Sequence, residues 1–174
     1  LYILPVLNVD GYNVVNRYTG RPNANGVDLN RNWLIGWEKD YDKSGCWDNG
    51  PITSGEFAGS EPETQALMAW AFEHPLQALV SYHAAAPGFY AADDPPGSDQ
   101  VSDWLSDYLA AASGYPNPAI NTGCFMTGSM VDFFANLGTA GTDLELTNHW
   151  DMEWSKNLKL LIALLNWDGV STKP

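Results

Sequence analysis

Short apolar runs alternate with helical patterns along this chain, and this alternation is what most restricts its possible fold. Runs typical of buried strands cover residues 1–7, 76–82 and 141–146. Segments with helical spacing or a helix-start signal cover residues 60–73, 101–112, 129–137 and 154–165, and Ser60 is the expected N-cap of the first. Loops are expected at 8–12, 34–60 and 84–98, which are rich in turn-forming residues. Strands that alternate with helices predict an α/β fold, in which ligands bind at the ends of strands.

Composition narrows the class of protein further. The 174 residues suffice for one domain, and 45% of them are hydrophobic, with eight Trp, which is ample for a core. The formal charge of −13 argues against nucleic acid and anionic membranes as partners. No apolar run approaches the ~20 residues that a membrane span needs. Cys46 and Cys124 permit one disulfide, which the sequence alone neither requires nor excludes.

All three arginines of the chain lie shortly after the first apolar run, although cationic residues are few. Arg17, Arg21 and Arg31 fall within fifteen residues, although the chain has eight Lys plus Arg and none between Lys43 and Lys156. This concentration predicts capture of an anion such as a carboxylate. The alternative is a set of surface ion pairs, which contribute little to stability.

Five motifs occur in a characteristic order. The first is Asn-x-Asp-Gly-Tyr at 8–12, followed by Arg-x-Asn-x-x-Gly-Val-Asp-Leu-Asn-Arg-Asn-Trp at 21–33. The others are Ser-Glu-Pro-Glu-Thr at 60–64, Val-Ser-Tyr-His at 80–83, Thr-Gly-Ser-Met-Val-Asp at 127–132 and Thr-Asp-Leu-Glu-Leu at 142–146. Together they resemble the zinc metallocarboxypeptidases, the carboxypeptidase A-like peptidases.

The resemblance implies a mixed, mainly parallel sheet with helices on both faces, the phosphorylase/hydrolase-like carboxypeptidase fold. Residues 1–174 would form the C-terminal two-thirds of a single catalytic domain, without its N-terminal strands. The abrupt start of the chain in a strand-like run also suggests missing neighbours, because interior strands need partners on both sides. The family's first two zinc ligands come from an upstream His-x-x-Glu motif, and none of the three histidines here is followed by Glu at that spacing.

The resemblance assigns the chemistry to His83, Glu145 and Arg21. His83 ends a buried-type strand and would be a zinc ligand; the alternative is a hydrogen-bonded core histidine. Glu145 would be the general base; the alternative is a partner in an internal salt bridge. Arg21 would polarise the scissile carbonyl, with Arg17 as the fallback. His149 is predicted to be a surface residue.

The resemblance assigns substrate binding to a second group of residues. Asn30 and Arg31 match the pair that clamps the terminal carboxylate. Asp143 and Val131 would line the pocket for the last side chain, although an acidic and an apolar residue favour different side chains. The alternative for Asp143 is a solvated carboxylate at a strand end. Cys124 falls where the family has a mobile active-site tyrosine, and a thiol is not an equivalent donor.

These assignments predict a zinc-dependent metallocarboxypeptidase that hydrolyses C-terminal peptide, or peptide-like amide, bonds. One alternative is a non-catalytic module that binds peptide carboxylates. Another is a peptidoglycan stem-peptide amidase of the same family, in which Asp143 would meet the amino group of diaminopimelate. The expected partner is a peptide with a free C-terminal carboxylate, and we expect a monomer in an extracellular or periplasmic location.

Overall fold

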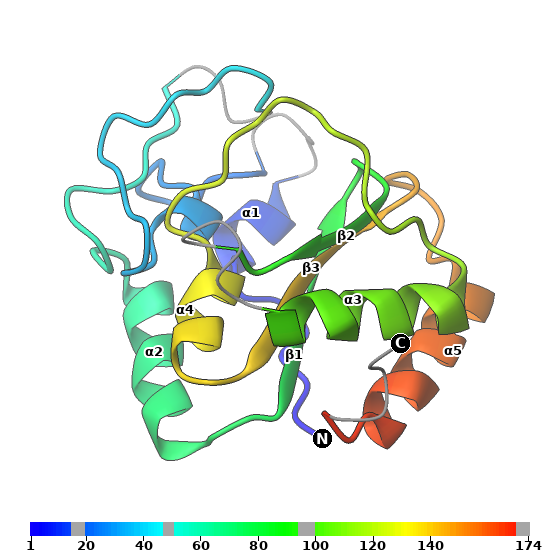
Figure 1. Cartoon of the computed structure of the whole chain (residues 1–174). Coiled ribbons are helices and arrows are strands. Elements are labelled where there is room, and N and C mark those ends of the chain that lie inside the picture. Colours follow the sequence, from blue (N-terminus) through cyan, green and yellow to red (C-terminus); the bar gives the residue numbers. More distant parts are fainter. Residues whose placement is uncertain (15–19, 47–50, 94–99, 170–174) are drawn as a thin grey trace. The chain divides into compact units, whose positions relative to one another are not determined.

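The computed structural model describes residues 1–14, 20–46, 51–93 and 100–169. Its elements are α1 (Val9–Asn13), the short 3-10 helix η1 (Leu29–Arg31), α2 (Pro62–Glu73), β1 (Ala78–Ala84), β2 (Gly88–Ala91), α3 (Gln100–Ser113), α4 (Met130–Asn136), β3 (Ala140–Leu146) and α5 (Trp154–Asn166) (Figure 1). They belong to two compact units. The loop unit is Leu1–His74 with Thr122–Phe133, and the sheet unit is Pro75–Asn121 with Phe134–Pro174.

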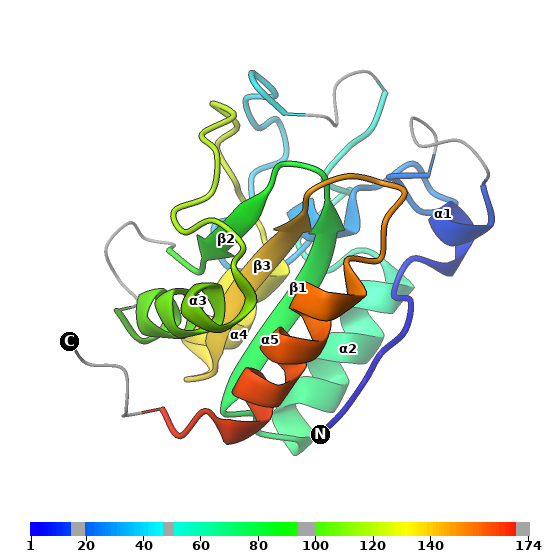
Figure 2. The ribbon, with the colours of Figure 1, turned by 90° about the vertical axis from the view of Figure 1, so that its right-hand side faces the viewer.

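The sheet unit contains a three-stranded sheet in the order β1-β3-β2 (Figure 2). β1 pairs with β3 in parallel, and β2 pairs with β3 in antiparallel. The sheet of the described residues is therefore smaller and more evenly mixed than the mainly parallel sheet that the sequence predicts. The α/β class itself is confirmed, with helices packed against mixed strands.

Helices α3 and α5 pack against one face of this sheet (Figure 2). The core between them holds Leu105 and Leu109 of α3, Leu144 of β3 and Leu160 of α5, all without solvent exposure. Each such leucine contributes roughly 1.5–3 kcal/mol by leaving water. Successive side chains of a strand point to opposite faces, so the neighbours of Leu144 on β3 point away from this core.

In the loop unit, the buried side chain of Asn32 connects several segments of backbone. Asn32 is fully buried, and its Nδ2 donates to the Ser54 carbonyl at 2.7 Å and to Ser60 Oγ at 3.0 Å. Its Oδ1 accepts from the Glu61 amide at 3.1 Å. Trp33, also fully buried, packs against Phe133 with ring centroids 5.3 Å apart. One buried amide thus ties the long loop predicted at 34–60 to the start of α2.

Several predicted elements are confirmed within one or two residues. Helices α3, α4 and α5 and strand β3 cover the segments with the matching patterns, and β1 begins and ends two residues later than predicted. No helix in the described part of the chain is both long enough and apolar enough to cross a membrane. Cys46 and Cys124 form a disulfide.

Four predictions about elements were wrong. Leu1–Leu4 are 57 to 75% exposed, and residues 1–7 form no strand, because a strand requires a hydrogen-bonded neighbour. The predicted loop at 8–12 contains the single turn α1, and the predicted loop at 84–98 contains β2. The N-cap of α2 is Glu61 rather than Ser60, whose hydroxyl donates to Glu61 Oε1 at 2.6 Å.

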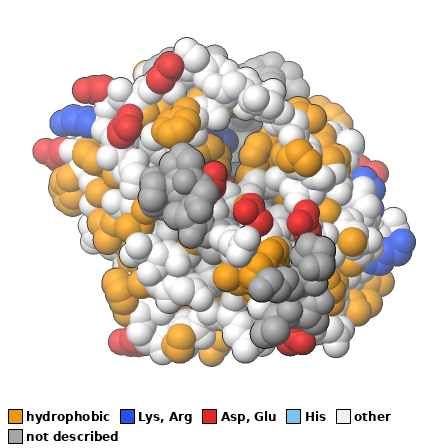
Figure 3. All heavy atoms as spheres, in the orientation of Figure 1, with side chains coloured by type: hydrophobic (Ala, Val, Ile, Leu, Met, Phe, Trp, Pro, Cys, Tyr) orange, Lys and Arg blue, Asp and Glu red, His pale blue; other side chains and the backbone are white. Residues whose placement is uncertain are grey.

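Acidic side chains can be seen on one face of the molecule in Figure 3. Figure 3 shows acidic side chains scattered on one face among larger apolar and uncharged areas. The net charge of −13 is therefore not gathered into one acidic patch on that face.

Candidate active site

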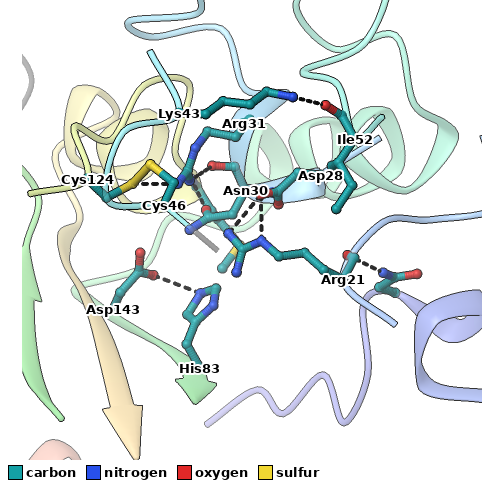
Figure 4. A network of polar contacts seen from close by, with 12 residues as sticks. Arg21, Asp28, Asn30, Arg31, Lys43, Cys46, Ile52, His83, Cys124 and Asp143 are labelled. Carbon is teal, nitrogen blue, oxygen red and sulfur yellow. Dashed lines mark hydrogen bonds and ion pairs between the residues drawn. A yellow bond between two sulfur atoms is a disulfide. The ribbon is translucent and has the colours of Figure 1, made fainter. Parts of the chain in front are cut away.

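Asp28 organises the loop that carries Arg21 and Arg31, called the arginine loop below (Figure 4). Its Oδ2 accepts from Arg21 Nε at 2.8 Å and Nη2 at 2.7 Å, while its Oδ1 accepts from the Asn30 amide at 2.9 Å and caps η1. Asp28 is 3% exposed. Burial opposes its ionisation, but the charges of Arg21 and Arg31 and these hydrogen bonds hold the pKa of Asp28 below its usual value. The carboxylate of Asp28 therefore favours its ionised form and fixes the Arg21 guanidinium.

Arg31 lies in the same loop and is almost fully buried, with 2% exposed. Its Nη1 donates to the Asn30 carbonyl at 2.8 Å, and its guanidinium carbon lies 5.6 Å from the centroid of the Tyr41 ring. Asn30 Oδ1 accepts from the Met130 amide at 2.9 Å. The structure therefore brings the predicted pair Asn30 and Arg31 together next to the start of α4. Arg17, the fallback for Arg21, lies outside the described residues.

Two further predicted substrate residues lie in the loop unit. Val131 follows Met130 in α4 and is buried. Cys124 is bonded to Cys46, so its sulfur carries no proton and can act only as an acceptor. Arg31 Nη2 contacts that sulfur at 3.4 Å. Cys124 therefore cannot donate the hydrogen bond that a tyrosine hydroxyl would supply.

The sheet unit carries the other predicted residues on one face of its sheet. In the parallel ladder, Ser81 of β1 pairs with Asp143 of β3, and His83 pairs with Glu145. Residues two apart on a strand, and partners in register, share a face. These four polar side chains therefore lie on the face opposite to Leu144 and its apolar core.

His83 is oriented by two of these neighbours (Figure 4). Its Nε2 lies 2.9 Å from Ser81 Oγ and 3.3 Å from Asp143 Oδ1. Asp143 Oδ1 accepts no hydrogen bond from this ring, but a nearby carboxylate electrostatically favours hydrogen on the nitrogen that faces it, which is Nε2. Asp143 is 3% exposed, which excludes the alternative of a solvated strand-end carboxylate.

Glu145 lies at the carboxyl end of β3. Its Oε2 accepts a hydrogen bond from the Ala86 amide at 3.2 Å. Burial, reinforced by the negative charge of Glu145, raises the pKa of Tyr90 to about 12. The backbone thus orients Glu145, which lies close enough to the partly buried Tyr90 phenol to raise its pKa.

The described residues contain no complete metal site. In ranges 1–14, 20–46, 51–93 and 100–169, no three His, Cys, Asp or Glu side chains gather to hold a metal ion. Catalytic zinc sites use three protein ligands. The second ring nitrogen of a ligand histidine usually faces a carboxylate or a carbonyl, and His83 Nε2 lies 3.3 Å from Asp143 Oδ1. His83 therefore suits the role of one ligand in a set that these residues do not complete.

The other two histidines have different surroundings. His74 Nδ1 lies 2.9 Å from the Trp70 carbonyl, and its ring stacks on Trp70 at a centroid distance of 4.5 Å. His149 follows β3 in an exposed loop beside Trp150. Ser81 was not predicted as a site residue. Its place two residues before His83 on a strand indicates that the two side chains lie on the same face of the sheet.

Comparison with known proteins identifies the family. Residues 1–149 match the model of peptidase family M14, the zinc carboxypeptidases. The chain belongs to this family. Human carboxypeptidase A6 is 34% identical over 98 residues, which make up 49% of this chain and 22% of that protein. Murein peptide amidase A of Escherichia coli K12 is 32% identical over 108 residues, 56% of this chain and 43% of that protein.

Solved structures agree with this M14 assignment. Murein-tripeptide amidase MpaA from Escherichia coli O157 is 26% identical with a TM-score of 0.62, over 92% of this chain and 65% of that one. Carboxypeptidase A from Helicoverpa armigera is 17% identical with a TM-score of 0.73, over 98% of this chain and 52% of that one. The match with carboxypeptidase A concerns the fold alone. The M14 chain described here thus spans between half and two-thirds of these two solved chains.

Proposed function

We propose that this chain belongs to a zinc-dependent enzyme that hydrolyses the C-terminal peptide bond, or a peptide-like amide bond, of its substrate. The observation that carries the proposal is the register between β1 and β3, which sets His83 beside Glu145 on one face of the sheet. An imidazole next to a carboxylate at the ends of strands is the arrangement that metal-assisted hydrolysis needs. Membership of the M14 family supports the same reaction.

Glu145 is the proposed general base. Zinc, when bound with His83 as one ligand, supplies the Lewis acidity that activates water. Glu145 accepts the proton of that water and passes it to the leaving amine. The hydrogen bond from the Ala86 amide to Oε2 holds the carboxylate in one orientation for both transfers.

The arginine loop is the proposed site for the substrate's charged end. Arg31 and Asn30 bind the terminal carboxylate, because a planar guanidinium matches it with two parallel hydrogen bonds. Arg21 stabilises the negative charge that develops on the scissile carbonyl oxygen. Its double contact with Asp28 fixes the guanidinium before substrate arrives, so no binding energy is needed to order it.

A second candidate is an amidase that acts on peptidoglycan stem peptides, and buried Asp143 favours it. A carboxylate with 3% exposure is suited to a substrate that carries an additional amino group, such as a diamino acid. Two relatives with murein peptide amidase activity in their names support this candidate. Contact with His83 gives Asp143 a competing role in orienting that imidazole.

The test uses the full-length protein, in which the proposal requires further zinc ligands besides His83. Hydrolysis of N-acylated dipeptides and of a murein tripeptide is measured for the wild type, Glu145→Gln and the exposed control Glu56→Gln. We expect Glu145→Gln to lose at least the ~10²–10⁴-fold typical of general acid–base catalysis while it retains zinc. The control should keep full activity.

Each outcome of this test distinguishes the candidates. Faster cleavage of the murein tripeptide than of simple dipeptides favours the amidase. Near-normal turnover in Glu145→Gln removes Glu145 from the mechanism. Protein that lacks zinc and activity yet binds free-acid peptides better than amidated ones is a carboxylate-binding module instead.

A further inference from the structure

Two segments that are distant in sequence meet at the guanidinium of Arg31. The disulfide joins Cys46 to Cys124 across 78 residues, and Arg31 Nη2 lies 3.4 Å from Cys124 Sγ. The ring of Tyr41, on the same segment as Cys46, lies 5.6 Å from the guanidinium carbon. Figure 4 shows the sulfur pair beside the end of the Arg31 side chain. The disulfide is therefore part of the immediate surroundings of Arg31.

The segment that contains Cys124 is fastened at its other end without the disulfide. The Gly128 carbonyl accepts from the Trp33 amide at 3.0 Å, and the Met130 amide donates to Asn30 Oδ1 at 2.9 Å. Gly128 has a φ of +57°, and a Cβ there would lie 2.6 Å from the Arg31 carbonyl oxygen. Residues 128–130 therefore follow the backbone of the arginine loop closely.

The end near Cys124 meets the segment of Cys46 through the disulfide and through close packing of backbone. Gly45 packs so tightly on this segment that a Cβ would lie 2.4 Å from the Thr122 carbonyl oxygen. Phe125, one residue after Cys124, is largely exposed. The covalent bond thus holds the sulfur of Cys124 at a place where neighbouring side chains reach into solvent.

We propose that the Cys46–Cys124 disulfide positions the Arg31 guanidinium, and that its reduction weakens binding of a substrate carboxylate. The proposal rests on the carboxylate-binding role of Arg31 proposed above. A dithiol reductant transfers two electrons and two protons to the bridge, which becomes two thiols, and the dithiol becomes a disulfide. Cys124 can then move away, and the long Arg31 side chain gains rotamers that a ligand must remove again.

The first arm of the test observes Arg31 directly in the full chain. The sequence has three arginines, so a ¹⁵N-arginine-labelled sample gives three side-chain Nε signals, which Arg31→Lys and Arg21→Lys assign. After complete reduction, shown by two alkylatable thiols, we expect Hε exchange of Arg31 to rise about tenfold. Arg21 is the internal control, because its contacts with Asp28 do not involve the disulfide. The Cys46→Ala, Cys124→Ala double variant should reproduce the reduced protein.

The second arm measures binding of an N-acetylated dipeptide free acid, with its amide as the control ligand. We expect the Kd for the free acid to rise about tenfold on reduction, which corresponds to about 1.4 kcal/mol. The Kd for the amide should not change. If the oxidised chain binds both ligands equally, the carboxylate role of Arg31 fails, while the exchange arm still decides the positioning role.

Two results would overturn the positioning role. One is unchanged Hε exchange of Arg31 in fully reduced protein. The other is an equal increase for Arg21 and Arg31, or a general loss of signal dispersion, because the disulfide would then stabilise the whole loop unit rather than this side chain.

Discussion

Replacing Asp28 by Asn tests whether a buried charge holds the arginine loop together. Asn keeps the shape of Asp and can still accept from the Asn30 amide, so the cap of η1 persists. The change removes the negative charge that two Arg21 nitrogens contact at 2.8 and 2.7 Å. It also places an amide NH2 donor where Oδ2 accepts from Arg21, so the ion pair and its hydrogen bonds are lost together while the cap remains.

The expected loss of stability in Asp28→Asn follows from the burial of Asp28 and the partial exposure of Arg21. Breaking a buried ion pair by removing one partner costs about 3–5 kcal/mol when the other charge stays buried. The Arg21 side chain is 26% exposed and can turn toward water, so we expect a smaller loss of about 2–3 kcal/mol in the free energy of unfolding. For a chain of this size, that corresponds to a decrease in Tm of about 4–12 °C.

The pH dependence has a definite sign. The pKa of Asp28 is lower in the folded protein than in the unfolded chain. Its stabilisation is therefore fully present above the unfolded pKa of about 3.9 and is lost as pH falls through the folded value. The difference in stability between wild type and Asp28→Asn should be constant from about pH 5.5 to 8 and shrink below about pH 4.

Urea unfolding at several pH values measures this difference. Asp40→Asn is the matched control, because Asp40 is exposed in the same unit and its replacement removes the same charge. The control should leave the urea midpoint nearly unchanged. Equal stability of Asp28→Asn and wild type at pH 7, or a difference that grows as pH falls, would refute the reasoning.

Three further predictions concern other parts of the molecule. Asn32→Ala should lower the free energy of unfolding by about 3 kcal/mol or more, measured by urea unfolding, because it leaves several buried polar partners unpaired. Glu145→Gln should lower the pKa of Tyr90 from about 12 toward its ordinary value, followed by ¹³C NMR of tyrosine, and an unchanged pKa would show that Glu145 does not act on it. In metal-free protein, the ¹⁵N shifts of His83 should show hydrogen on Nε2, and Asp143→Asn should reduce that preference; hydrogen on Nδ1 in the wild type would contradict this orientation.

Local patterns in the sequence were enough to predict helices α2 to α5 and the central strand β3. Apolar residues recur at helical spacing in both α3, as Leu105 and Leu109 do, and α5. This period can be read from residues that are close together in the sequence. The run around Leu144 likewise predicts β3. The order of the motifs predicted the M14 family, because residues needed for one chemistry recur at similar spacings.

Other features depended on contacts between residues that are far apart in the chain. β2 has four residues, too few to show a period, and it forms because β3 offers an edge. Residues 1–7 carry a strand-like pattern but form no strand, since pairing needs a second strand as well as a suitable sequence. The strand propensity of a segment alone therefore predicts neither the formation of β2 nor the absence of a strand at residues 1–7.

The same division holds for the candidate site. The sequence alone determined which residue types are available: the arginines at 21 and 31, one strand histidine and one strand glutamate. Only the tertiary structure decided that Asp143 is buried beside His83 and that Cys124 is bonded to Cys46 beside Arg31. Burial and through-space contact change what a carboxylate or a sulfur can do, and both depend on how the chain folds back on itself rather than on adjacent residues.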